Sequence, residues 1–177
     1  MKLNRILVPI VAGVFLVGGL TAPPTTADAV WLTTRAAWTN PDFDETSPLP
    51  RVVNLRYASH ARFDRVVIRM RGSLPGGVAR YQRTFTYDGS GDPVPIQGRS
   101  GLQVSLRPAY AHNNAGDHIY DGPALVRPRL QTLKALAFTG DFEGVVSFAF
   151  ALTHRAPYRV NLLKAPRRVV IDFAHRR

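Results

Sequence analysis

The strongest constraint on the fold is an alternation of apolar and polar side chains with a period of two residues. It is clearest at residues 60–72, HARFDRVVIRMRG, where Val66, Ile68 and Met70 fall on one side. Successive side chains of an extended strand point to opposite faces of a sheet. The segment is therefore predicted to be a strand with one face in a core and the other face covered by arginine.

Similar alternation recurs along the chain, and no stretch shows the 3.6-residue period of a helix. The further segments are 53–57, 78–87, 94–98, 102–106, 133–140, 144–152, 158–163 and 167–173. Segment 144–152 is apolar or small on both faces, which predicts a central position. About nine short strands separated by turns are typical of an antiparallel β-sandwich in a single domain.

The first residues resemble an export signal. Lys2 and Arg5 precede an apolar run at 6–20, and Ala27 and Ala29 form a small-x-small cleavage pattern. Residues 1–29 are therefore predicted to be a signal peptide, with an uncleaved membrane anchor as the alternative. No later stretch is apolar for long enough to span a bilayer.

The predicted exported chain divides into an extended arm at 30–50 and a β-sandwich domain at 51–177. The arm is rich in polar residues and proline, and we expect it to dock through its aromatic rings without forming a regular element. The chain contains no cysteine. The domain must therefore be held together by core burial, since no disulfide can form.

The charge of the chain favours an anionic partner. Its formal net charge is +11, supplied mostly by arginine, and such a charge attracts anions over long distances. Outside the cytoplasm the abundant anions are cell-wall polymers, acidic glycans and lipid head groups, so nucleic acid is not an expected partner. The alternative is that arginine merely solvates the surface.

The titratable residues do not form a recognisable catalytic or metal site. The histidines lack a metal-ligand spacing, and His112, Asp117 and His118 are better explained as polar residues of a loop at 107–129. Asp141 and Glu143 are the only close carboxylates late in the chain, and a turn explains them. We therefore predict no enzyme, no catalytic residue, no metal and no cofactor.

Four segments together resemble the AMIN-like domain of actinobacterial secreted proteins and lipoproteins. They occur in the family's order and are HARFDRVVIRMRG, YDGSGDPVPIQGRSGLQVSL, GDFEGVVSFAFAL and YRVNLLKAPRRVVIDF. The resemblance covers about residues 51–173. It implies a β-sandwich that binds peptidoglycan, as the related AMIN domains of cell-wall amidases and pilus secretins are taken to do. This chain differs in having no amidase or secretin portion and no lipobox cysteine.

The alternation places several arginines on one sheet face, where they could present planar donors to carboxylates or phosphates. Within the same motifs, Asp64 is expected to cap backbone amides, and Asp172 to pair with a guanidinium on a neighbouring strand. The alternative for the whole row is a solvated face whose arginines pair with local acids. The predicted ligand-binding residues are Arg56, Arg65, Arg69 and Arg71.

The leading functional prediction is an exported, non-catalytic module that associates with the cell wall, through peptidoglycan or an attached anionic glycan. The alternative is a secreted β-sandwich that binds another envelope protein or a lipid through the arm and the loop at 107–129. Added salt should weaken the first interaction, because it screens exposed charges, and should leave the second unchanged.

Overall fold

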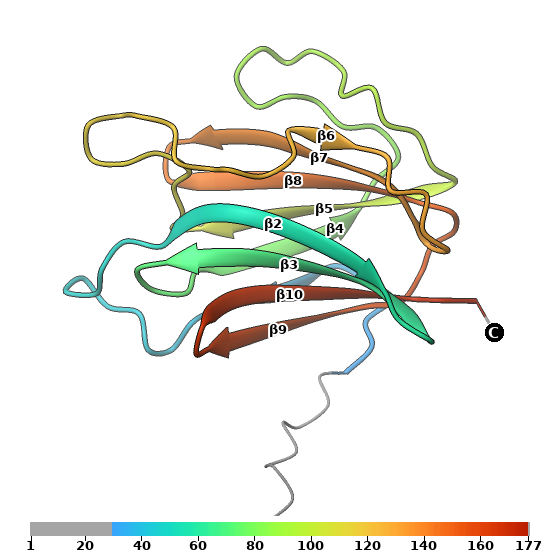
Figure 1. Cartoon of the computed structure of the whole chain (residues 1–177), viewed down its shortest axis with the longest axis horizontal. Helices are drawn as coiled ribbons and strands as arrows, with labels where there is room; N and C mark the ends of the chain where they lie inside the picture. The colour runs from blue at the N-terminus through green and yellow to red at the C-terminus, as the bar shows by residue number, and fades with distance from the viewer. Residues whose placement is uncertain (1–29, 177) are drawn as a thin grey trace, which may run out of the picture.

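The computed structural model describes residues 30–176, and these form two facing β-sheets (Figure 1). The predicted signal peptide at 1–29 lies outside the described residues. The strands are β1 (Ala36–Trp38), β2 (Arg51–Ser59), β3 (Phe63–Arg71), β4 (Gly76–Tyr81), β5 (Ser100–Arg107), β6 (Leu125–Val126), β7 (Leu133–Phe142), β8 (Val145–Leu152), β9 (Tyr158–Lys164) and β10 (Arg167–Ala174).

All strand pairs within the sheets are antiparallel. The six-stranded sheet has the order β1-β4-β5-β8-β7-β6, and the four-stranded sheet has the order β2-β3-β10-β9. The predicted all-β sandwich is therefore confirmed. β8 lies between β5 and β7, as its two apolar faces indicated.

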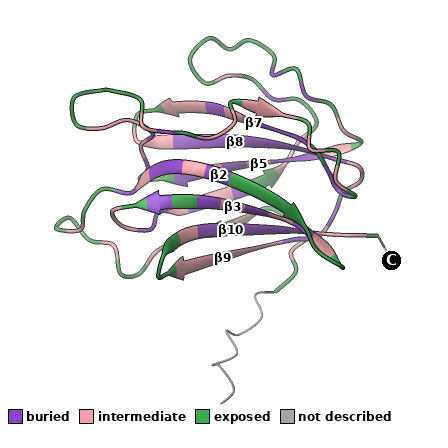
Figure 2. Cartoon of the chain, viewed as in Figure 1, coloured by how far each residue is buried: buried purple, intermediate pink, exposed green. Residues whose placement is uncertain are grey.

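The core lies between the two sheets and is built from the inward side of the alternation. Val66, Ile68 and Met70 of β3 are all buried, and they share one apolar cluster with Phe148 and Phe150 of β8. Figure 2 shows buried and more exposed residues alternating along β3. The period-two pattern therefore identifies which residues of this strand fill the core.

The segment at 94–98 was predicted to be a strand, and that prediction is wrong. The chain from β4 to β5 instead folds over the outer face of the six-stranded sheet, where Phe85, Val94 and Ile96 pack on small side chains. These small residues are Ala135, Ala137, Ala149 and Ala151. Val94 and Ile96 are buried but belong to no strand, so their alternating pattern results from packing on the sheet and not from pairing within it.

The extended N-terminal segment is more regular than expected. Residues Ala36–Trp38 form β1, which pairs with β4 at the edge of the six-stranded sheet. The Trp38 ring lies on Gly77, where a Cβ atom would come within 2.4 Å of the ring. A residue without a side chain at position 77 therefore allows the aromatic docking that the sequence predicted.

The side chain of Asp64 connects the two sheets. It lies on β3 and is fully buried, and its Oδ2 atom accepts hydrogen bonds from the backbone amides of Thr132 (2.6 Å) and Leu133 (2.8 Å) at the start of β7. Its Oδ1 atom accepts from the Ser59 hydroxyl (2.9 Å) and lies 2.9 Å from Nε2 of His175. The expected capping of backbone amides is thus present, and it joins strands of opposite sheets.

Replacing this carboxylate should destabilise the fold. Asp64→Ala leaves two buried amides without acceptors, and we expect a loss of about 3 kcal/mol in the free energy of unfolding. Ser59→Ala removes one hydroxyl contact and should cost about 1 kcal/mol. Urea unfolding of both variants measures the difference, and equal small losses would contradict the role given to Asp64.

Asp64 should also make stability depend on acid pH. Burial works to raise the pKa of Asp64, but its hydrogen bonds outweigh burial and hold that pKa below its ordinary value. The stabilisation is therefore fully present above the unfolded-state pKa of about 3.9 and is lost as pH falls through the folded-state pKa. Urea unfolding from pH 7 to pH 2 should show a smaller acid loss for Asp64→Asn than for the parent. Parallel pH curves would contradict this.

Candidate functional site

The outward side of the four-stranded sheet carries the predicted arginine row. The alternation of β3 turns Arg65, Arg69 and Arg71 away from the core, while their neighbours Val66 and Met70 are buried. Arg56 lies beside them on β2, opposite Val67 in the strand register. The structure therefore brings the four predicted residues onto adjacent strands.

Arg65 differs from the other members of this row because it is tied to an acid. Its Nε and Nη2 atoms donate to the two carboxylate oxygens of Asp172 on β10, at 2.7 and 2.9 Å. Arg159 on β9 donates from Nε to the same carboxylate at 2.8 Å. The predicted pairing of Asp172 across strands is present, and the two guanidiniums leave the aspartate fully buried.

Two aromatic rings cover this charged group. The Arg159 guanidinium lies 4.7 Å from the centre of the Trp31 ring and 5.2 Å from that of Phe63, and Arg65 lies 4.9 Å from Phe63. Such contacts strengthen when solvent is excluded. Through Trp31, these contacts hold the N-terminal arm against β3 and β9 of the four-stranded sheet. Arg65 therefore stabilises the sheet through Asp172, and its role in binding a ligand stays a prediction.

The remaining arginines form a separate group, which we call the arginine face and define as Arg56, Arg69, Arg71 and Arg168. The first three are exposed and none of the four has an ion pair among the described residues. Arg69 and Arg168 lie directly opposite each other in the β3–β10 register. Like charges in that position destabilise a sheet unless a counter-charge lies near them.

Arg168 was missed as a ligand-binding candidate, although its position carried a signal. It lies in the alternating segment that ends the chain, four residues before Asp172 and therefore on the same face. What the sequence could not show is the pairing of β10 with β3, because these strands lie far apart in the chain. That pairing places Arg168 beside Arg69.

The other titratable candidates have structural roles. His112 Nδ1 lies 2.6 Å from Oδ2 of Asp141, and the same oxygen accepts from the Ala111 amide at 2.9 Å. Glu143 and Gly144 have positive φ angles of 47° and 72° and form the turn between β7 and β8. The interpretation as a turn is confirmed for Glu143, but it is wrong for Asp141, which lies within β7.

Residues 30–176 contain neither a candidate metal site nor a candidate membrane span. No group of three or more histidine, aspartate or glutamate side chains is arranged to hold a metal ion. No helix in this part of the chain is long and apolar enough to cross a membrane.

The different contacts of Arg65 and Arg69 predict different costs of substitution. Arg65→Ser removes a bidentate pair from a buried carboxylate and should lower the free energy of unfolding by about 2 kcal/mol. Arg69→Ser changes an exposed side chain and should stay within about 0.5 kcal/mol of the parent. Thermal and urea unfolding provide the comparison, and a larger loss for Arg69→Ser would refute the assignment.

Comparison with known proteins identifies the domain. Neither a search of curated proteins nor a search of solved structures finds a significant match. A family model, that of the AMIN-like domain, matches residues 50–175. This match spans nine of the ten strands, from β2 to β10, and includes the arginine face and both buried aspartates. The chain therefore belongs to the AMIN-like domain family.

Proposed function

We propose that this protein is an exported, non-catalytic module that binds the cell wall through its arginine face. Membership of the AMIN-like family supports a binding role toward peptidoglycan. The predicted signal peptide supports export. The ligand would be peptidoglycan or an anionic glycan attached to it, and the contacts would be made by Arg56, Arg69, Arg71 and Arg168.

One observation carries this proposal: the pairing of Arg69 with Arg168 in a sheet register that offers neither of them an acid. Asp172 is the one acid among the described outward positions of these four strands, and it is occupied by Arg65 and Arg159. A ligand carboxylate or phosphate would supply the missing counter-charge. Guanidinium groups bind both through paired hydrogen bonds.

The shape of the face suits an extended polymer. Alternate residues along a strand are about 7 Å apart, so Arg69 and Arg71 present their charges at a regular spacing. Arg56 and Arg168 widen the row over the adjacent strands β2 and β10. A polymer with repeated negative groups would contact several of these arginines at once, and multiple weak contacts would add to a useful affinity.

A groove supports the alternative function, binding of an envelope protein or a lipid. Trp38 and Phe43 from the arm and Tyr110 from the predicted loop line a groove of about 670 Å³. Trp38 Nε1 is buried and has no hydrogen-bond partner among the described residues. An apolar partner in this groove would bind independently of salt, in contrast to a polymer on the arginine face.

Sedimentation with insoluble peptidoglycan tests the proposed function. The purified full-length chain should pellet with the polymer at low salt and remain in solution at about 0.5 M salt, where exposed charges are screened. The variant Arg56→Ser, Arg69→Ser, Arg71→Ser should lose most of the pelleting at low salt. Arg65 is left unchanged because it stabilises the sheet.

A second triple variant controls for net charge. Arg80, Arg83 and Arg129 are exposed and lie outside both the four-stranded sheet and the groove, so changing them to serine removes the same charge elsewhere. This variant should pellet like the parent. An equal loss of pelleting in both variants would show that binding depends only on net charge, and it would refute the proposed role of the arginine face. Pelleting that resists salt would favour the apolar groove.

A further inference from the structure

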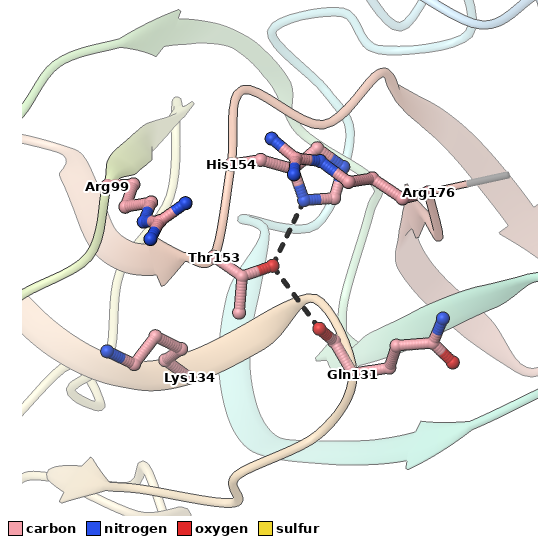
Figure 3. Close-up of a pocket in the computed structure, with 6 residues that line it drawn as sticks. All are labelled: Arg99, Gln131, Lys134, Thr153, His154 and Arg176. Carbon is pink, nitrogen blue, oxygen red and sulfur yellow. Dashed lines mark hydrogen bonds between the residues drawn. The ribbon is translucent and has the colours of Figure 1, made fainter.

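A second basic region lies at the end of the sandwich where the described chain terminates. Figure 3 shows this pocket, which has a volume of about 410 Å³ and which we call the end pocket. It lies beside the start of β5, the start of β7 and the end of β8, and so it is separate from the arginine face. Its lining residues are Arg99, Gln131, Lys134, Thr153, His154 and Arg176.

Sheet register brings together three of the four chain segments that line the pocket, and the contact of His175 with Asp64 places the fourth, Arg176. Ser100 of β5 and Leu133 of β7 both pair with Leu152, the last residue of β8. Gly98 lies against the same strand end, where a Cβ atom would come within 2.4 Å of the Leu152 carbonyl oxygen. The absence of a side chain at position 98 lets the chain run close enough to place Arg99 at the pocket.

The end pocket holds several cationic groups and no acidic one. In Figure 3 the guanidinium of Arg99 and the ammonium of Lys134 lie on one side of Thr153, with His154 and Arg176 on the other. No ion pair within residues 30–176 involves Arg99, Lys134 or Arg176. Several positive charges around one pocket, without an acid among its lining residues, create a local attraction for an anion.

Hydrogen bonds orient the imidazole of His154. The Thr153 hydroxyl donates to the Gln131 carbonyl oxygen at 3.2 Å, so its oxygen can accept a hydrogen bond from Nδ1–H of His154 at 3.0 Å. In the neutral ring, Nε2 then carries a lone pair. Protonation turns Nε2 into a donor and adds a positive charge to the pocket, so the ring would bind an anion better when it is protonated.

The surroundings of His154 oppose that protonation while no anion is bound. Burial lowers the pKa of His154 first, and the charges of Arg176 and His175 lower it further. Arg99 and Lys134 are the other charged groups that line the pocket. A bound dianion would offset these repulsions and raise the pKa, which links ligand binding to a measurable property of one side chain.

We propose that the end pocket binds the phosphate group of a small phosphorylated molecule. A phosphate offers enough oxygen atoms to meet arginine, lysine and histidine from several directions, whereas a carboxylate has two. The pocket volume falls in the range of small-molecule sites, about 300–1,000 Å³, and so exceeds what a free phosphate needs. The ligand class is therefore an organic phosphate of about the size of a sugar phosphate.

Calorimetric titration of the full-length chain tests this at low salt, with glucose 1-phosphate, inorganic phosphate, acetate and glucose as probes. We expect the sugar phosphate to bind at least as tightly as inorganic phosphate, and glucose and acetate to give no saturable heat. Arg99→Ser with Lys134→Ser should weaken phosphate binding by at least about tenfold. Arg69→Ser with Arg71→Ser removes equal charge from the arginine face and should bind phosphate like the parent.

Several outcomes would overturn the proposal. Equal weakening in the two double variants would show a response to net charge alone. If acetate bound as tightly as phosphate, the pocket would be a carboxylate site and not a phosphate site. If none of the anions gave saturable heat, the pocket would not be an anion-binding site. The proposed wall binding is distinguishable, because the arginine-face variants should lose pelleting and keep phosphate binding.

Titration of His154 by NMR gives a second readout. Sulfate is the suitable probe, since its charge stays constant over the range of about pH 5 to 8 in which histidine titrates. Sulfate should raise the pKa of His154 in the parent and in the Arg69→Ser, Arg71→Ser variant. It should have little effect in the Arg99→Ser, Lys134→Ser variant, and an equal rise there would refute the direct role of these two cations.

Discussion

The buried carboxylate of Asp64 is the interaction on which the arrangement of the two sheets depends. Apolar contact between sheets resists separation but tolerates sliding, because it has no preferred direction. The two amides of Thr132 and Leu133 supply direction, since they must reach one oxygen atom of β3. The same carboxylate contacts His175, so it also holds the C-terminal segment near the start of β7.

This clamp has an effect beyond stability. Gln131 directly precedes the clamped amides, and Arg176 directly follows the clamped histidine. Both residues line the end pocket. The carboxylate therefore sets the relative position of two chain segments that no strand pairing joins. In this way, a buried polar interaction determines the shape of the end pocket on the surface.

Asp64 and Asp172 show how one residue type serves the two sides of a sheet. Asp64 faces the core and is satisfied mainly by backbone and neutral donors, whereas Asp172 faces outward and is buried only because Arg65 and Arg159 cover it. The arginine row is consequently divided. At one end Arg65 is paired with the aspartate, and the other end, around Arg69, keeps its charge available to solvent.

Much of the fold could be predicted from the sequence, because alternation is a local property. The strand around Val66 and Ile68 and the central place of β8 were both accessible in this way. The pattern failed at Val94 and Ile96, because burial under a connection produces the same apolar spacing as burial in a strand. It also missed β6, where two residues, Leu125 and Val126, are too few to show a period.

The candidate sites were less accessible, because they depend on contacts between distant segments. Arg65 and Arg69 look equivalent in the sequence, and only the pairing of β3 with β10 separates the one that meets an acid from the one that meets Arg168. Arg99 and His154 lie in segments far apart in the chain, and the alternation of apolar residues gives no sign that these segments are close in space. Their proximity follows from the register of β5 and β8 and from the space left by Gly98.

The apolar layer of Phe85, Val94 and Ile96 has a consequence for how the molecule can contact a surface. It closes the outer face of the six-stranded sheet around Ala137 and Ala149, so the two broad sides of the sandwich are unlike. A molecule lying on a charged polymer by its four-stranded side turns this covered side outward. Under the proposed function the contact would be one-sided: the protein would coat a wall as a single layer with a defined orientation, and its two broad faces would not crosslink neighbouring strands of polymer.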